Sequence, residues 1–201
     1  MKRERSLLIA LAVATFVPLA AWSASSLSGA AQAKEKAAMA RYAPEAVVIG
    51  PSSAFIEVAI DDGTGQFTMG EPNGGPILLY GHPSPWSSFT SIQVDGQVYT
   101  NKGQPFGTLL QPPTTTGNTS EMIFQVGPTP IQVHQLITLV TGSSTGHADT
   151  YLVQYKLVNT DTSGHTVGCR IMFDPNPAMD AGESVGKIEG MALAFQIAVH
   201  L

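Results

Sequence analysis

The chain has 201 residues and a formal net charge of −5 at pH 7, with 43% hydrophobic and only 12% charged residues. This composition excludes an acidic disordered tail, which would carry more charge and fewer apolar residues, and a coiled coil, which would be rich in Glu, Lys, Arg and Leu. The sequence shows no basic patch, so we expect no nucleic-acid partner. The length suits one domain that can bury a core.

The N-terminus carries the three parts of a secretory signal in order. Basic residues precede an uncharged run over 6–22, and small residues follow up to an Ala-x-Ala site that ends at Ala33, with a second candidate site ending at Ala30. We therefore predict a signal helix over residues 1–33 that is removed on export, and a periplasmic, cell-surface or secreted protein. The alternative is an uncleaved anchor, because the run lies at the short limit of a spanning helix, about 17–25 residues.

Cleavage after Ala33 would leave seven basic and 14 acidic residues in the mature chain. Because an acidic protein is repelled by anionic surfaces, we expect no membrane contact after the signal is removed. Residues 34–53 mix Ala, Lys, Glu and Pro, as a linker does, and the domain is expected over 54–201.

Apolar and polar residues alternate in the first part of the domain, which is the period of a β-strand. Short strands are expected over 54–60, 64–70, 76–81, 89–94 and 97–100. The sequence Asp61-Asp62-Gly63 indicates a tight turn. The pair Asp95-Gly96 indicates a type I′ hairpin turn, which needs positive φ at both central positions. A loop rich in Pro, Thr and Gly is expected over roughly 101–119.

The second part of the domain holds longer alternating segments, over 122–126, 131–140, 151–158 and 166–173. Turn-joined neighbours run antiparallel, and one apolar face per strand predicts two packed sheets. The residues expected to face the core are Val153, Tyr155, Leu157, Val167, Cys169 and Ile171.

The fold class that these patterns predict is all-β, an antiparallel β-sandwich, since no amphipathic helix of 10 residues occurs before residue 178. The apolar tail over 192–201 fits either a last buried strand or a short helix, and a truncated or altered C-terminus would also explain it. Cys169 is the only cysteine, so no internal disulfide is expected. We interpret it as a small buried hydrophobe, because no base lies near it in the sequence.

Two stretches resemble segments of a group of exported bacterial β-sandwich proteins of unknown function. The first is PILLYGHPSPWSSFT over 76–90, continued by the Thr-x-Ile-x-Val-Asp-Gly pattern that ends at Gly96, and the second is DTYLVQYKLVNTDTSGHTVGCRIMFD over 149–174. The group is similar in fold to galactose-mutarotase-like (supersandwich) domains, so the resemblance implies a β-sandwich. It does not imply an activity, because fold does not carry function. After Asp174 the sequence departs from the group.

The loop that runs from Tyr80 to Trp86 contains two prolines, which stiffen it. A stiff loop presents its aromatic groups at low entropic cost, and the face of an indole suits the C–H groups of a sugar ring. We therefore predict Tyr80, His82 and Trp86 as ligand-binding residues for carbohydrate or a cell-surface glycan. The alternative is that Trp86 caps the core, since large aromatic side chains are highly buried on average.

Other polar residues give weaker signals. The pair His147 and Asp149 would suit a metal only with a third ligand, and we favour a polar turn. Arg170 in an apolar strand needs a carboxylate, which Asp149, Asp161 or Asp174 would supply. A mutarotase-type enzyme needs a histidine acid and a carboxylate base, for which the pairs to test are His82 or His165 with Asp174.

No nucleotide, hydrolase, metalloprotease or thiol-redox motif occurs, and we predict no catalytic residue, metal or cofactor. The function that fits best is an exported, non-catalytic β-sandwich module that contacts carbohydrate. One alternative is an aldose-epimerase-like or other carbohydrate-active enzyme. The other is a structural or adhesive surface subunit, which suits the low charge and the high Thr, Ser and Gly content.

Overall fold

The computed structural model of the chain describes residues 6–10, 46–174 and 195–200. These residues form twelve strands and one short 3-10 turn, Pro72–Gly74 (η1), and they contain no α-helix. The predicted all-β fold class is therefore confirmed. Nothing in these ranges is a helix long and apolar enough to span a membrane.

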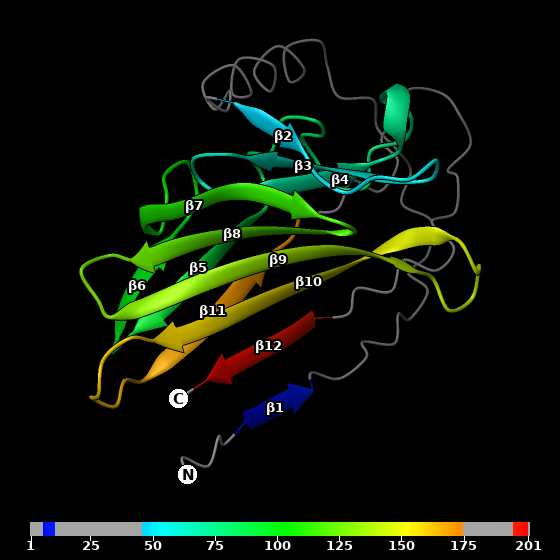
Figure 1. Cartoon of the computed structure of the whole chain (residues 1–201). Helices are drawn as coiled ribbons and strands as arrows, with labels where there is room; N and C mark the ends of the chain where they lie inside the picture. The colour runs from blue at the N-terminus through cyan, green and yellow to red at the C-terminus, as the bar shows by residue number, and fades with distance from the viewer. Residues whose placement is uncertain (1–5, 11–45, 175–194, 201) are drawn as a thin grey trace, which may run out of the picture.

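The largest sheet has six strands in the order β1-β12-β10-β9-β8-β7 (Figure 1). Its strands are β1 (Ser6–Ala10), β7 (Gly107–Thr116), β8 (Thr119–Val126), β9 (Ile131–Thr141), β10 (Ala148–Asn159) and β12 (Phe195–His200). All pairs are antiparallel except β10 with β12, which run parallel. The predicted class of an antiparallel sandwich is therefore confirmed for most of the pairs, and the parallel pair joins two strands that are not neighbours in the chain, because β11 lies between them and belongs to another sheet.

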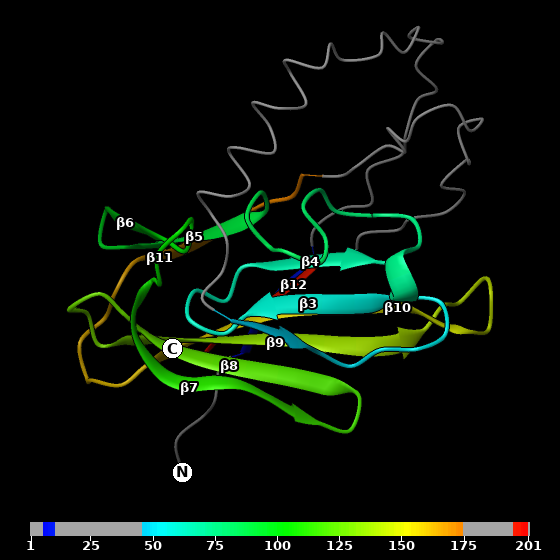
Figure 2. The same ribbon diagram turned by 90° about the horizontal axis from the view of Figure 1, so that it is seen from above.

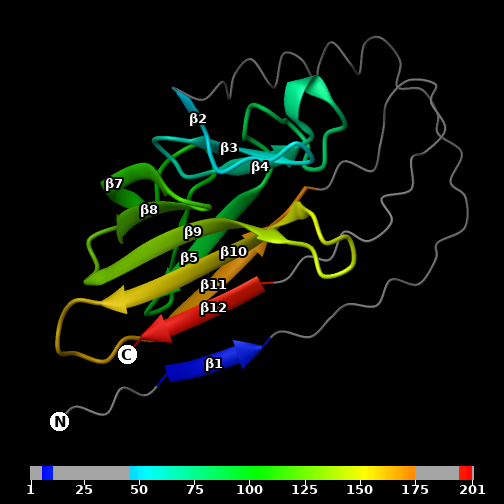
Figure 3. The same cartoon turned by 45° about the vertical axis from the view of Figure 1, so that its right-hand side comes forward.

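Two smaller sheets of three strands complete the fold. One has the order β11-β5-β6, and the other has the order β2-β3-β4. Their strands are β2 (Val47–Ile49), β3 (Glu57–Asp61), β4 (Phe67–Gly70), β5 (Phe89–Val94), β6 (Gln97–Thr100) and β11 (Val167–Met172). Figure 2 shows both small sheets on the same side of the six-stranded sheet, and Figure 3 shows β5 and β11 behind β9 and β10.

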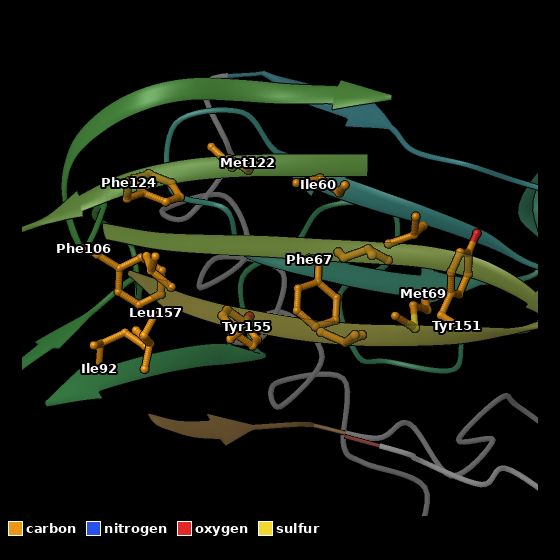
Figure 4. Packing of buried hydrophobic residues seen from close by; sticks show 14 of the residues in the cluster. Ile60, Phe67, Met69, Ile92, Phe106, Met122, Phe124, Tyr151, Tyr155 and Leu157 are labelled. Carbon is orange, nitrogen blue, oxygen red and sulfur yellow. The ribbon is translucent and has the colours of Figure 1, made fainter. Parts of the chain in front are cut away.

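The core lies between the large sheet and the two small ones. Alternate residues of β8, β9 and β10 are buried in it, as the period of two predicts. Figure 4 shows this packing, in which Phe124, Tyr155 and Leu157 of the large sheet share one cluster with Ile60, Phe67, Met69 and Ile92 of the small sheets. The predicted core residues of β10 are buried, whereas those of β11 are half-buried and pack against the cluster from its margin.

Cys169 belongs to this half-buried set. Burial raises the pKa of its thiol to about 12, so the reactive thiolate is scarce at neutral pH. The environment agrees with the interpretation of Cys169 as a small hydrophobe, and its side chain packs against the core.

Both predicted turns are present. Asp95 and Gly96 have φ values of 50° and 86° between β5 and β6, as a type I′ turn requires. Between β3 and β4, the Asp61 carboxylate accepts hydrogen bonds from the backbone N–H of Gly63 (3.1 Å) and of Thr64 (2.6 Å). The carboxylate thus satisfies two backbone N–H groups of the turn that would otherwise bind water, and it fixes the register of the hairpin.

Three local predictions are wrong. Residues 107–116 form β7 and not a loop, because β7 is an edge strand that tolerates prolines. Val47–Ile49, inside the expected linker, form β2. Residues 76–81 form only an isolated bridge from Gly70 to Ile77, since the N–H groups of Leu78 and Leu79 both point to the carbonyl of Met69.

The two ends of the chain are described only in part. Ser6–Ala10 form β1, and the rest of the predicted signal helix lies outside the described residues, so the signal helix stays a prediction. In the apolar tail, Phe195–His200 form β12, so the strand alternative is the one that the structure has for this segment.

A buried polar network joins all three sheets. The Tyr155 hydroxyl lies 2.7 Å from Thr90 Oγ1 of β5 and donates to Gln135 Oε1 of β9 at 2.9 Å. Gln135 Nε2 in turn donates to the carbonyl of Gly65, in the turn between β3 and β4. The Tyr155, Thr90 and Gln135 side chains belong to residues that are each 1% exposed, so water does not compete for these bonds.

An exposed ion pair ties β11 to the β5–β6 turn. His165 Nδ1 lies 2.6 Å from Asp95 Oδ2, and its Nε2 lies 3.4 Å from Asp161 Oδ2. The hydrogen bond to Asp95 raises the pKa of His165, and the same bond lowers the pKa of Asp95. The histidine contribution to stability is therefore complete below its unfolded pKa of about 6.5 and is lost as pH rises through the raised folded value.

The Asp95 contribution is complete above its unfolded pKa of about 3.9 and is lost as pH falls through the lowered folded value. We therefore expect this pair to stabilise the fold most between about pH 4 and 6.5. Melting temperature measured against pH should fall less steeply between about pH 6 and 8 in the His165→Gln variant than in the parent chain. His147→Gln, at an exposed loop histidine without an ion pair among the described residues, is the control and should change the profile less than His165→Gln does. Parallel profiles for the parent and His165→Gln would contradict the assignment.

Candidate functional site

The loop that connects β4 to β5 presents Trp86. The ring of Tyr80 meets the indole edge to face, with 5.4 Å between centroids and an interplanar angle of 73°. The Ser87 hydroxyl donates to the Tyr80 carbonyl at 2.6 Å and closes the loop behind the two rings. Gly81 has φ of 95°, and a Cβ there would lie 2.6 Å from the indole nitrogen. Glycine at position 81 is therefore what lets the backbone pass under Trp86.

A partly open hollow of about 290 Å³ lies beside this indole, lined by Trp86, Ser87, Lys102, Met172 and Asp174. Its place follows from the strand pattern. On β11 the residues that alternate with Cys169 point away from the core, and Met172 is paired in register with Phe89 of β5. The hollow thus lies at the end of the β11-β5-β6 sheet, on the face turned away from the core.

The polar walls of the hollow come from Lys102 and Asp174. Lys102 follows β6, and its Nζ lies 5.0 Å from the centroid of the Phe89 ring. Asp174 follows β11, and its backbone is held at both ends. Its carbonyl accepts from the Tyr80 N–H at 2.8 Å, and its N–H donates to Ser88 Oγ at 3.1 Å. An aromatic wall, a cation and a carboxylate therefore meet around one small volume.

His82 lies away from this hollow. Its side chain is 5% exposed, and its Nε2 lies 2.9 Å from Glu57 Oε1 at the start of β3. The ring packs on Gly70, where a Cβ would lie 2.5 Å from the histidine Cδ2. The structure therefore gives His82 a contact with the β2-β3-β4 sheet.

Of the three predicted ligand-binding residues, only Trp86 lines the hollow. Tyr80 supports the indole from behind, and His82 is directed elsewhere. Sequence reasoning did not assign Ser87, Lys102 or Met172 to the site, and it considered Asp174 only as an ionic or acid–base partner. The signal available for Met172 was the alternation of β11, which places it opposite Cys169, whereas Asp174 lies beyond the end of that strand.

The predicted pairs that involve Arg170 and Asp174 do not form. Arg170 is exposed and makes no ion pair within the described ranges, so the expected structural pair is wrong. Asp174 is hydrogen-bonded by neither His82, which contacts Glu57, nor His165, which contacts Asp95 and Asp161.

The metal alternative at His147 and Asp149 finds no third ligand among the described residues. The ring of His147 stacks on Phe55 with 4.7 Å between centroids, and the Asp149 carboxylate accepts from the Thr150 hydroxyl at 3.1 Å. Within the part of the chain that the structure describes, no three His, Cys, Asp or Glu side chains are grouped so that they could hold a metal ion.

No protein-family model matches the chain, and neither a curated protein nor a solved structure shows detectable similarity to it.

Proposed function

We propose that the chain is an exported, non-catalytic module of the antiparallel β-sandwich class, and that it binds carbohydrate in the hollow beside Trp86. The signal pattern of the N-terminus supports export, and the packing of two small sheets across a large one supports the sandwich class. The similarity to galactose-mutarotase-like domains and the bacterial origin stay predictions.

The observation that carries this proposal is the position of Trp86. The residue is half-buried, it is not part of the buried core cluster, and it lines an open hollow together with hydrogen-bonding groups. Ligand sites for small molecules combine apolar walls with a few polar groups in a concavity of about 300–1,000 Å³, and the volume of this hollow lies just below that range. A sugar ring stacked on the indole would place its hydroxyl groups at the polar walls.

A glycan array followed by fluorescence titration tests the proposal. Trp22→Phe in the full chain leaves Trp86 as the only tryptophan. We expect a bound glycan to change the emission of Trp86 and to protect it from acrylamide. Trp86→Ala should weaken binding about tenfold or more, since a lost aromatic contact alone costs about 0.5–1.5 kcal/mol beyond the buried area.

The matched control is Phe55→Ala. Phe55 is also a solvent-accessible aromatic residue, 49% exposed, but it stacks on His147 and does not line the hollow. This variant should keep full affinity. Equal losses in the two variants, or the absence of any bound glycan, would reject the proposal and favour a structural surface subunit.

A further inference from the structure

We propose that the hollow selects neutral sugars that offer two adjacent hydroxyl groups, with Asp174 as the specificity-determining acceptor and Lys102 as the donor. This inference rests on the proposed function and adds the chemical class of ligand to it.

The first argument is that both charged groups are available. Among the described residues, no hydrogen bond or ion pair occupies the Asp174 carboxylate. The Lys102 ammonium is held over the Phe89 ring and forms no ion pair with Asp174 or with another described carboxylate. Toward the described residues, the carboxylate of this lining residue therefore keeps its capacity to accept hydrogen bonds from a ligand.

The second argument concerns the geometry of a carboxylate. Its two oxygens can accept from two O–H donors at once, and adjacent hydroxyl groups on a sugar ring present such a pair of donors. Lys102, with three N–H donors and no acceptor, complements the remaining hydroxyl or ring oxygens. The three side chains together match a ring with one apolar face and a polar edge.

The third argument concerns charge. The hollow holds one cation and one anion, Lys102 and Asp174, so its lining carries no net charge. An acidic sugar that reached Lys102 would bring its own carboxylate near Asp174, and an amino sugar that reached Asp174 would bring its ammonium near Lys102. Neutral sugars avoid both repulsions, and like-charge contacts are a general means of rejecting a wrong ligand.

The fourth argument is that hydrogen bonds connect the backbone of Asp174 to the loop that carries Trp86. The backbone of Asp174 is bonded to Tyr80 and Ser88, which lie on the same loop as Trp86. Ser88 is 3% exposed, so its bond to the Asp174 N–H is protected from water. The stacking surface and the hydroxyl acceptor are thus fixed relative to each other before a ligand arrives, which lowers the entropic cost of binding.

Calorimetric titration of the full chain tests this inference with three probes. These are the neutral methyl glycoside that binds best, its analogue lacking one hydroxyl of the adjacent pair, and its uronic acid counterpart. Asp174→Asn should weaken binding of the neutral glycoside about tenfold or more, because hydrogen bonds to a charged acceptor are the strong ones. The deoxy analogue should bind the parent chain about as weakly, with little further loss on Asp174→Asn. The uronic acid should bind more weakly than the neutral glycoside.

The controls are Asp62→Asn and Lys156→Gln, which remove the same charges away from the hollow and should not change affinity. Lys102→Gln should weaken binding of the neutral glycoside less than Asp174→Asn does. Thermal melts verify that each variant is folded. Unchanged affinity in a folded Asp174→Asn, or preference for the uronic acid, overturns the inference. If Trp86→Ala abolishes binding and Asp174→Asn does not change it, the proposed function stands and the inference about Asp174 is rejected. If the parent chain binds no sugar, both the proposed function and the inference are rejected.

Discussion

Replacing Leu157 with alanine is expected to lower the free energy of unfolding by about 2–5 kcal/mol. Leu157 is 2% exposed on β10, where it is paired in register with Val133 of β9 and packs in the core between the sheets. The close packing of a protein interior leaves little room for neighbouring side chains to move into the space. The substitution therefore removes buried apolar surface and also creates a cavity.

Ile171→Ala is the matched variant for this measurement. Ile171 also packs against the core, but it is half-buried at its margin, so the neighbouring side chains and water can fill the space. We expect a clearly smaller loss in urea unfolding experiments analysed with a common slope. A Leu157→Ala variant as stable as the parent chain would show that the register of β10 is wrong, because a shift by one residue turns Leu157 to the opposite face.

Removing the Tyr155 hydroxyl is expected to cost about 1–3 kcal/mol. In Tyr155→Phe, Thr90 Oγ1 and Gln135 Oε1 both lose a partner in a region closed to water. Burial also raises the pKa of Tyr155, so the hydroxyl stays protonated and able to donate over the whole range in which the protein is folded. The loss comes from two stranded polar groups and not from packing, because the ring is retained.

A double-mutant cycle separates the network from general effects. Tyr155→Phe and Thr90→Val should show a coupling of about 0.5–3 kcal/mol in urea unfolding. Tyr99→Phe is the control, since Tyr99 also packs against the core but its hydroxyl makes no hydrogen bond to another described residue. Additive losses for Tyr155 and Thr90 would argue that the hydroxyl contact between the sheets contributes nothing.

The strands of the second half could be predicted because each has one buried face. Val153, Tyr155 and Leu157 alternate with residues of the outer face, and that alternation is visible without knowledge of the partner strands. The β5–β6 turn was equally accessible, since Asp95 and Gly96 together satisfy a local requirement for positive φ. Both signals are local, and both need only the chain itself.

The predictions were wrong where the structure of a segment depends on the position of its strand in a sheet. The prolines of β7 are typical of a loop, and only the order of the described strands shows that β7 lies at the edge of its sheet, where prolines are tolerated. The composition of the candidate site also depends on how the strands pair. Trp86 stood out by its loop, but Lys102 and Asp174 reach it through the pairing of β5 with β6 and with β11. Sequence reasoning also could not know that Glu57, on a strand of another sheet, lies against His82.

The edge strand β7 has a consequence for how copies of the chain behave together. Pro112 and Pro113 fall in a register shift of β7, where no residue of β8 is paired with them. Neither proline has a backbone N–H, so at this irregularity β7 cannot offer a regular row of donors to another strand. A strand from another molecule would meet an interrupted row of hydrogen-bonding groups at this point of the edge. The two prolines that make β7 resemble a loop in the sequence therefore also make this edge of the sheet a poor template for fibre-like pairing between molecules at high protein concentration.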